Sequence, residues 1–126
     1  MGKKIPDEVI DMALEDIANN GDKLDLCSAE PADYAGISAV SLGQVSLTLG
    51  DGNGDYTIGD GDVSGRKLNV AAQTVTGSGT GTATHAVISD SINSKIKAIT
   101  TCNIPVVDTE DIPVNAFDVW EIRDPS

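Results

Sequence analysis

Short segments in which apolar and polar residues alternate recur along this chain and constrain its fold more than any other feature. "KLDLCS" and "KIKAITTC" are two examples, and glycine, proline, asparagine or aspartate separates such segments from one another. This alternation is typical of strands that bury one face. Val and Ile, which favour strands, number 23 against 7 Leu, and 13 Gly supply turns. The sequence therefore predicts a mainly β fold, an antiparallel β-sandwich or barrel of about six to eight short strands after one N-terminal amphipathic helix.

The predicted strands and the connections between them follow from this pattern. The strand segments span residues 23–28, 39–50, 66–75, 80–89, 95–102 and 114–122. In the second segment the alternation slips by one at Gly43–Gln44, which predicts a bulge or bend. Leu68, Val70 and Ala72 share one face of the third segment, and the acidic, proline-bounded stretch Pro105–Pro113 is expected to be a loop.

"IPDEVIDMALEDIANNGD" is the one clear helix. Pro6 suits its first position, and Gly21, free to adopt a left-handed conformation, is expected to end it. One apolar stripe at helical spacing consists of Val9, Ile10, Ala13, Leu14 and Ile17. This stripe is expected to pack against a sheet or a partner, because the polar face is too acidic for a membrane surface.

The length of 126 residues suits one domain, residues 1–126, with a helix at 1–21 and a β domain at 22–126. The net charge of −12 argues against nucleic acid as a partner, and no stretch approaches a membrane span. Lys3 and Lys4 precede acidic residues rather than an apolar run, so no signal peptide is expected. Synthesis in a cytoplasm would keep Cys27 and Cys102 reduced, and two buried free thiols are predicted.

The charge is distributed unevenly along the chain. Residues 5–33 carry nine acidic residues and one Lys. Residues 63–103 instead carry four basic residues and a single Asp. The acidic end and the basic middle could dock head to tail on neighbouring copies, although solvated faces are the simpler interpretation.

"DGNGDYTIGDGD", residues 51–62, places acidic or amide oxygens close to the ligand spacing of a calcium loop. The ligand positions would be Asp51, Asn53, Asp55, Thr57, Gly59 and Asp62. The spacing resembles the dockerin version of this loop. Tyr56 occupies the position that normally requires Gly, and the flanking segments are predicted strands rather than helices. A glycine-rich connection between strands is therefore the expected structure, and no metal or cofactor is predicted.

No arrangement of residues indicates an enzyme. His85 is the only histidine, and a pair with Cys27 or Cys102 would lack a third group to orient it. Asp108, Glu110 and Asp111 are expected to form a solvated loop. The last segment contains the aromatic and apolar residues Phe117, Val119 and Trp120. They could dock into another subunit, but we favour the interpretation that they cap the core of the domain.

Several stretches resemble, in order, a family of small virion proteins of tailed phages. They are "IPDEVIDMAL", "LDLCSAEPADY", "GDVSGRKLNVAA", "GTGTATHAVI" and "NAFDVWEIRDP". The chain departs from that family at Ala86, where relatives often have an aromatic residue, and in a longer segment before "GDVSGRK". The resemblance implies a non-enzymatic decoration or cement protein on the capsid surface, made in the host cytoplasm. Its implied partners are the major capsid protein and other copies of itself.

Three other functions remain open. One is a tail, baseplate or fibre-associated virion protein, which would differ from a decoration protein in location and copy number. Another is a calcium-binding, dockerin-like adhesion module. An esterase or thiol enzyme is the last, and the single His85 argues against it.

Overall fold

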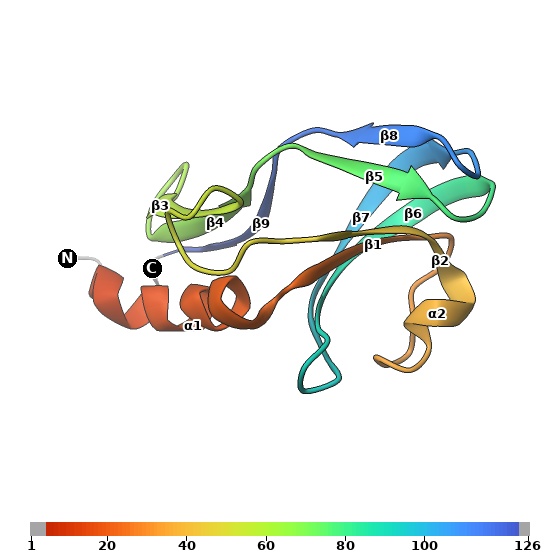
Figure 1. Ribbon diagram of the computed structural model, residues 1–126. Helices are drawn as coiled ribbons and strands as arrows, with labels where there is room; N and C mark the ends of the chain where they lie inside the picture. Colours follow the sequence, from red (N-terminus) through yellow and green to blue (C-terminus); the bar gives the residue numbers. More distant parts are fainter. Residues whose placement is uncertain (1–4, 124–126) are drawn as a thin grey trace.

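The computed structural model describes residues 5–123, so Lys3, Lys4 and the last residues of "NAFDVWEIRDP" lie outside the described part. The fold is mainly β with one N-terminal helix, as predicted, and every strand pairing is antiparallel. A curled six-stranded sheet has the order β7-β6-β1-β2-β5-β8, and a second sheet has the order β3-β4-β9 (Figure 1). The described residues thus form nine strands, more than the six to eight predicted.

The elements in chain order are α1 (Asp7–Asn20), β1 (Lys23–Cys27), α2 (Ile37–Val40), β2 (Ser41–Ser46), β3 (Tyr56–Asp60), β4 (Arg66–Val70), β5 (Gln73–Gly77), β6 (Gly81–Asp90), β7 (Lys95–Val106), β8 (Asp111–Val114) and β9 (Phe117–Ile122). In the described part of the chain, neither helix combines the length and the apolar character needed to span a bilayer.

Several segments differ from their predicted boundaries. The predicted strand 39–50 is reduced to β2, because residues 39–40 belong to α2 and β2 ends at Ser46, and the predicted connection 51–62 contains β3. The stretch Pro105–Pro113 is not a continuous loop, because β7 continues to Val106 and β8 begins at Asp111. Pro113 is tolerated because β8 is an edge strand that pairs only with β5. The predicted strand 66–75 is also two strands, since the chain leaves the small sheet after β4 and enters the large sheet at β5. Ala72, in this crossing, is exposed rather than aligned with Leu68.

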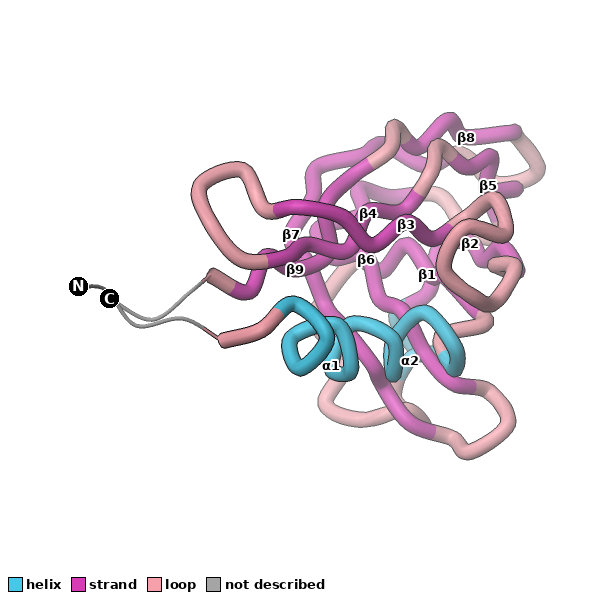
Figure 2. Tube along the Cα trace, turned by 90° about the vertical axis from the view of Figure 1, so that its left-hand side faces the viewer, coloured by secondary structure: helices cyan, strands magenta, loops and turns pink. Residues whose placement is uncertain are grey.

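The helix α1 packs against the small sheet with part of the predicted stripe (Figures 1 and 2). Its buried residues are Ile10, Leu14, Ile17 and Ala18. Val9 and Ala13, which were predicted to belong to the stripe, are exposed, and Ala18 is buried instead. The packed face is therefore rotated from the predicted one, because two sheets rather than one contact the helix.

Both ends of α1 differ from the expected caps. Pro6 is the residue before the helix, not its first residue. Gly21 follows the last residue and has φ −81° and ψ 83°, so it is not left-handed. Glycine is required there for space: a Cβ atom would lie 2.5 Å from Ile88 Cγ2 and 2.7 Å from Tyr56 Oη.

One continuous core joins the helix and both sheets. It includes Leu14 from α1, Leu26 and Ile88 from the large sheet, and Tyr56 and Leu68 from the small sheet. A smaller cluster lies on the opposite face of the large sheet, where Ile37 of α2 covers Cys27 and Val87. The large sheet is therefore buried on one face by the core and partly covered by α2 on the other.

The predicted irregularity in β2 is present. Leu26 pairs with Gly43 whereas Cys27 pairs with Ser41, so Leu42 is an extra residue in the ladder. The bulge therefore lies one residue before the predicted slip at Gly43–Gln44. It bends the strand where the α2 segment joins it.

Candidate functional site

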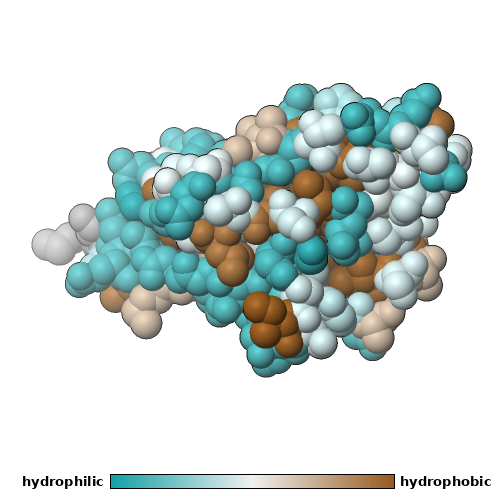
Figure 3. Space-filling view, viewed as in Figure 1, coloured by the Kyte–Doolittle hydropathy of each residue, from teal (hydrophilic) through white to brown (hydrophobic). Residues whose placement is uncertain are grey.

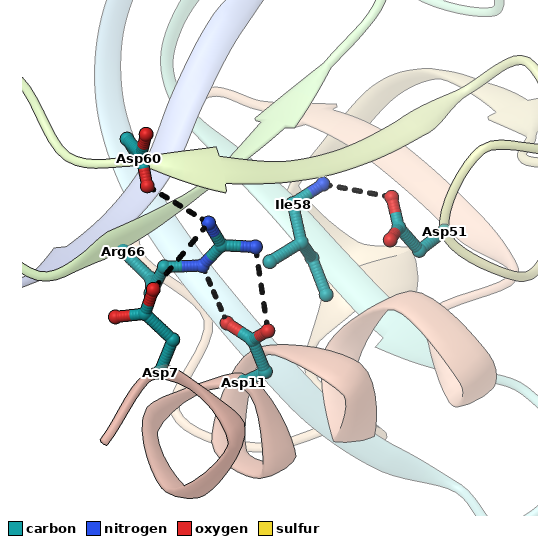
Figure 4. Close-up of polar contacts among 6 residues, drawn as sticks. All are labelled: Asp7, Asp11, Asp51, Ile58, Asp60 and Arg66. Carbon is teal, nitrogen blue, oxygen red and sulfur yellow. Dashed lines mark hydrogen bonds and ion pairs between the residues drawn. The ribbon is translucent and has the colours of Figure 1, made fainter.

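The acidic segment 51–62 is held by bonds to its own surroundings. Asp51 Oδ1 accepts a hydrogen bond from the backbone N–H of Ile58 at 2.8 Å (Figure 4). Asp55 accepts bonds from Thr48 N at 2.6 Å and from Gln73 Nε2 at 2.8 Å. Burial opposes ionisation of Asp55, but these bonds prevail and lower its pKa. These two carboxylates stabilise the connection between β2 and β3.

Two further side chains at the calcium-like spacing also bind groups of the protein itself. Asn53 Nδ2 donates to the carbonyl of Leu49 at 2.9 Å, and Asp62 forms an ion pair with Lys67 at 2.7 Å. Strand β3 begins at Tyr56, whose buried hydroxyl donates to the carbonyl of Gly21 at 2.6 Å. Residues 5–123 contain no group of three or more His, Cys, Asp or Glu side chains placed to hold a metal ion. The segment is not the single connection predicted, because strand β3 occupies Tyr56–Asp60 within it and pairs with β4. Its neighbours along the chain are the strands β2 and β4, so it is not a helix-flanked calcium loop.

A cluster around Arg66 joins α1 to the small sheet (Figure 4). Arg66 Nε lies 2.9 Å from Asp11 Oδ1, and its Nη1 lies 2.9 Å from Asp60 Oδ1 and 4.0 Å from Asp7 Oδ2. The hydrogen bond to Asp11 is the main reason why the pKa of Arg66 is raised above its ordinary value. The cluster connects residues 55 positions apart, which makes it a joint between elements rather than a reactive site.

The structure places His85 directly opposite Cys27 in the β1–β6 ladder. Burial, more than the nearby Asp25 carboxylate, raises the pKa of the Cys27 thiol to about 12. A thiol with so high a pKa stays protonated near neutral pH and is a poor nucleophile. His85 Nδ1 lies 2.8 Å from the hydroxyl of its neighbour Thr84. Within residues 5–123 the Cys27 thiol forms no hydrogen bond with His85, and its raised pKa is the opposite of what an activated cysteine needs.

Both cysteines are free, as predicted, but only Cys27 is fully buried. Cys102 is partly buried, and its Sγ atom lies 3.5 Å from the carbonyl oxygen of Ala83. Burial also raises the pKa of this thiol. Neither cysteine is therefore poised for catalysis at neutral pH.

The final strand β9 divides between core and surface. Phe117 and Val119 pack against the core, as the favoured interpretation predicted, whereas Trp120 is 49% exposed. Among the acidic residues of the predicted 105–113 loop, Asp108 and Glu110 are exposed in the turn between β7 and β8. Asp111 begins β8 and accepts a bond from the Thr76 hydroxyl at 3.2 Å.

Exposed apolar side chains concentrate at the end of the molecule that carries α1 and the small sheet. Four of the six large exposed hydrophobic residues come from this part: Val9, Met12, Val63 and Trp120. Ile92 is exposed in the β6–β7 turn. On the face drawn in Figure 3, hydrophobic surface stands out near the lower edge of the molecule. Exposed large hydrophobic side chains are thus more numerous at the end that carries α1 than elsewhere among the described residues.

A small pocket beneath α2 was not predicted from the sequence. It has a volume of about 260 Å³ and lies between the segment Tyr34–Ser38 and the outer face of the large sheet. Asp25 and Ser89, both only 2% exposed, line it. The alternation of "KLDLC" places Asp25 on the face away from the core, but it gives no sign that α2 covers that face.

Comparisons with protein-family models, with curated proteins and with solved structures found no match for this chain.

Proposed function

We propose that this chain is a non-enzymatic structural protein of a tailed-phage virion, a decoration protein that binds the outside of the capsid shell and stabilises it. Its partners would be the major capsid protein and other copies of itself. Many equivalent copies on a lattice need only weak individual contacts, because attachment at several points multiplies their effect.

The observation that carries this proposal is where the stretches similar to phage virion proteins lie in the fold. "GDVSGRK" forms the β3–β4 turn and begins β4. Gly65 in this turn has φ +70°, and a Cβ atom there would collide with the carbonyl oxygen of Ile122. The next residue, Arg66, binds Asp11 of α1. This stretch therefore supports the joint between helix and sheet.

Two other stretches on which the resemblance rests contact each other. Ser28 of "LCSAEP" accepts a bond from the hydroxyl of Thr84 of "GTATH" at 3.1 Å, across 56 positions of sequence. Ser28 N also donates to the carbonyl of Val40 at 2.9 Å, which fixes the α2 segment to the sheet. Residues in the stretches on which the resemblance rests thus connect the helices to the sheets. Such a role suits a structural subunit better than a catalyst.

The contact with the shell is best supported at the helix end. Val9, Met12 and Trp120 expose apolar surface there, and burial of apolar surface favours association. Lys97, on a basic strand, is less available for such a contact, because it is paired with Asp16 of α1 at 3.0 Å. Trp120 is the strongest candidate, because a large aromatic ring can dominate the energy of a contact.

The deciding experiment is cryo-electron microscopy of intact particles together with protein quantification. We expect on the order of hundreds of copies, lying on the outer surface of the shell. A handful of copies at the tail would instead assign the chain to the tail or baseplate. Calcium calorimetry on the isolated chain tests the adhesion-module alternative, for which binding heat and a lower melting temperature with EDTA would be required.

Replacing Trp120 tests the contact itself. Trp120→Ala should reduce rebinding of purified protein to particles stripped of it by tenfold or more, because hot-spot aromatic residues contribute about 2 kcal/mol or more. Val107→Ala, at another exposed apolar position, is the matched control and should bind like the unaltered chain. Equal rebinding of both variants would exclude Trp120 from the contact.

A further inference from the structure

The pocket beneath α2 has the features of a site for a single positively charged side chain. We propose that it binds the ammonium group of a lysine presented by a partner protein, with Asp25 as the anionic floor. The pocket of about 260 Å³ lies below the range of about 300–1,000 Å³ that is typical for drug-sized ligands. Its size suits one long side chain better than a complete small molecule.

Asp25 supplies a buried carboxylate with only neutral donors. It is 2% exposed and accepts bonds from Ser41 Oγ at 2.8 Å and from Gln44 Nε2 at 3.1 and 3.2 Å. No described cation forms an ion pair with it. Lys23, two positions earlier in β1, donates to Ser46 Oγ at 2.9 Å instead. A cation entering the pocket would offset the cost of this buried charge.

Ser89 provides a second, independent polar group that lines the pocket. It is 2% exposed and lines the pocket, yet its hydroxyl makes no hydrogen bond with any residue in the described range 5–123. Buried polar side chains are nearly always hydrogen-bonded. An ammonium N–H donated to the Ser89 oxygen, beside the carboxylate of Asp25, would satisfy both groups.

The walls and the donors already present favour lysine over other cations. Tyr34 and Ile37 line the pocket and suit the methylene stem, and the aromatic ring can also attract a cation. Gln44 Nε2 bridges both oxygens of Asp25, so it occupies the edge that a bidentate guanidinium would use. One carboxylate and a few hydroxyls are too few for calcium, which takes six to eight oxygen ligands.

The test is an NMR titration of the intact, isolated chain with Nα-acetyl-lysine methylamide. Saturable amide shifts are expected at Asp25, Ile37 and Ser89. The norleucine counterpart, which lacks the ammonium group, should bind at least tenfold more weakly. Because the isolated chain is used, the result does not depend on any location in a virion.

Substitutions in the pocket complete the test. Asp25→Asn should weaken binding at least tenfold, and Ser89→Ala should weaken it severalfold while the fold is retained. Asp108→Asn removes the same unit of charge from an exposed turn and is the matched control, expected to bind like the unaltered chain.

Three results would overturn the proposal. The first is the absence of saturable shifts at the pocket residues. The second is equal binding of the norleucine compound. The third is that both variants, Ser89→Ala and Asp25→Asn, bind the lysine compound as strongly as the unaltered chain does. If Asp25→Asn does not fold, unchanged binding by Ser89→Ala alone would overturn the proposal.

Discussion

The turn after α1 depends on two residues that meet across 35 positions of sequence. Tyr56, fully buried, donates its hydroxyl to the carbonyl of Gly21 at 2.6 Å, and Gly21 leaves no room for a side chain. Burial raises the pKa of Tyr56, so the hydroxyl keeps its proton and remains a donor across the neutral range. This contact fixes the end of the helix over the small sheet.

Gly21→Ala should therefore destabilise the protein. The new methyl group would press against Ile88 and Tyr56, and overpacking of this kind costs about 1–3 kcal/mol. Urea unfolding measures the loss. Gly59→Ala is the matched control, because its Cβ would meet nothing within 4 Å, and it should leave stability unchanged or slightly raised. Equal stability of the two variants would contradict the close approach at Gly21.

At the scale of elements, Arg66 joins α1 to the small sheet. Arg66→Met should lower the free energy of unfolding by about 1–2 kcal/mol, since it leaves three carboxylates of an acidic protein without their cation. Amide exchange in α1 should accelerate more than exchange in β6. Arg123→Met is the control, because Arg123 is exposed and pairs with Glu121 only two positions away. A uniform increase in exchange across the fold would exclude a specific joint.

The β6–β7 hairpin is held by two carboxylates that cap its turn. Asp90 accepts bonds from Asn93 Nδ2 at 2.8 Å and from the backbone N–H groups of Ile92 and Asn93 at 3.0 Å, and these bonds lower its pKa. At Asp22, burial opposes ionisation, but bonds from the Ser91 hydroxyl and N–H prevail and lower the pKa.

Acidification should loosen this hairpin before it unfolds the molecule. Both folded-state pKa values lie below the unfolded value of about 3.9. The stabilisation is therefore complete above about pH 4 and is lost as the pH falls through the folded values. NMR from pH 7 to 2.5 should show Ser91–Asn93 amides shifting before the core does. Asp90→Ala should abolish the early shift of these amides. Loss of the hairpin and the core at the same pH would contradict the prediction.

At the scale of the molecule, part of the uneven charge of the sequence is compensated within one chain. Asp11 and Asp16 of the acidic helix pair with Arg66 and Lys97 of the more basic middle. Some of the charges considered for head-to-tail docking of copies thus bind α1 to the sheets of its own chain. Much of the remaining net charge of −12 stays on the surface, where like charges repel.

Salt should therefore stabilise the protein. Raising NaCl from about 0.02 to 0.5 M should raise the melting temperature by a few degrees, because screening of acidic repulsion outweighs the loss of a few exposed ion pairs. Calorimetry measures the shift. CaCl2 and MgCl2 at equal concentration provide a matched comparison, and we expect them to change the melting temperature equally. A larger increase with calcium would indicate a metal site in the 51–62 segment.

The local pattern determined which segments become strands and which becomes a helix, because alternation and helical periodicity are properties of the backbone itself. The same pattern failed at Pro105–Pro113 and at Ala71–Ala72. In the first, pairing with β5 makes a strand of an acidic stretch, and in the second the chain changes sheets. The acidic 51–62 segment was predicted as a connection, but it contains strand β3, Tyr56–Asp60, because pairing with β4 makes a strand of a glycine- and aspartate-rich stretch.

By itself the sequence determined the fold class, the N-terminal helix and the bulge near Gly43, since each depends on neighbours along the chain. Only the tertiary structure decided the rotation of α1, the space requirement at Gly21 and the burial of Asp25. These depend on residues brought together from distant positions, and periodicity carries no information on which faces meet. The pocket beneath α2 is therefore a product of the fold, although every residue that lines it is visible in the sequence.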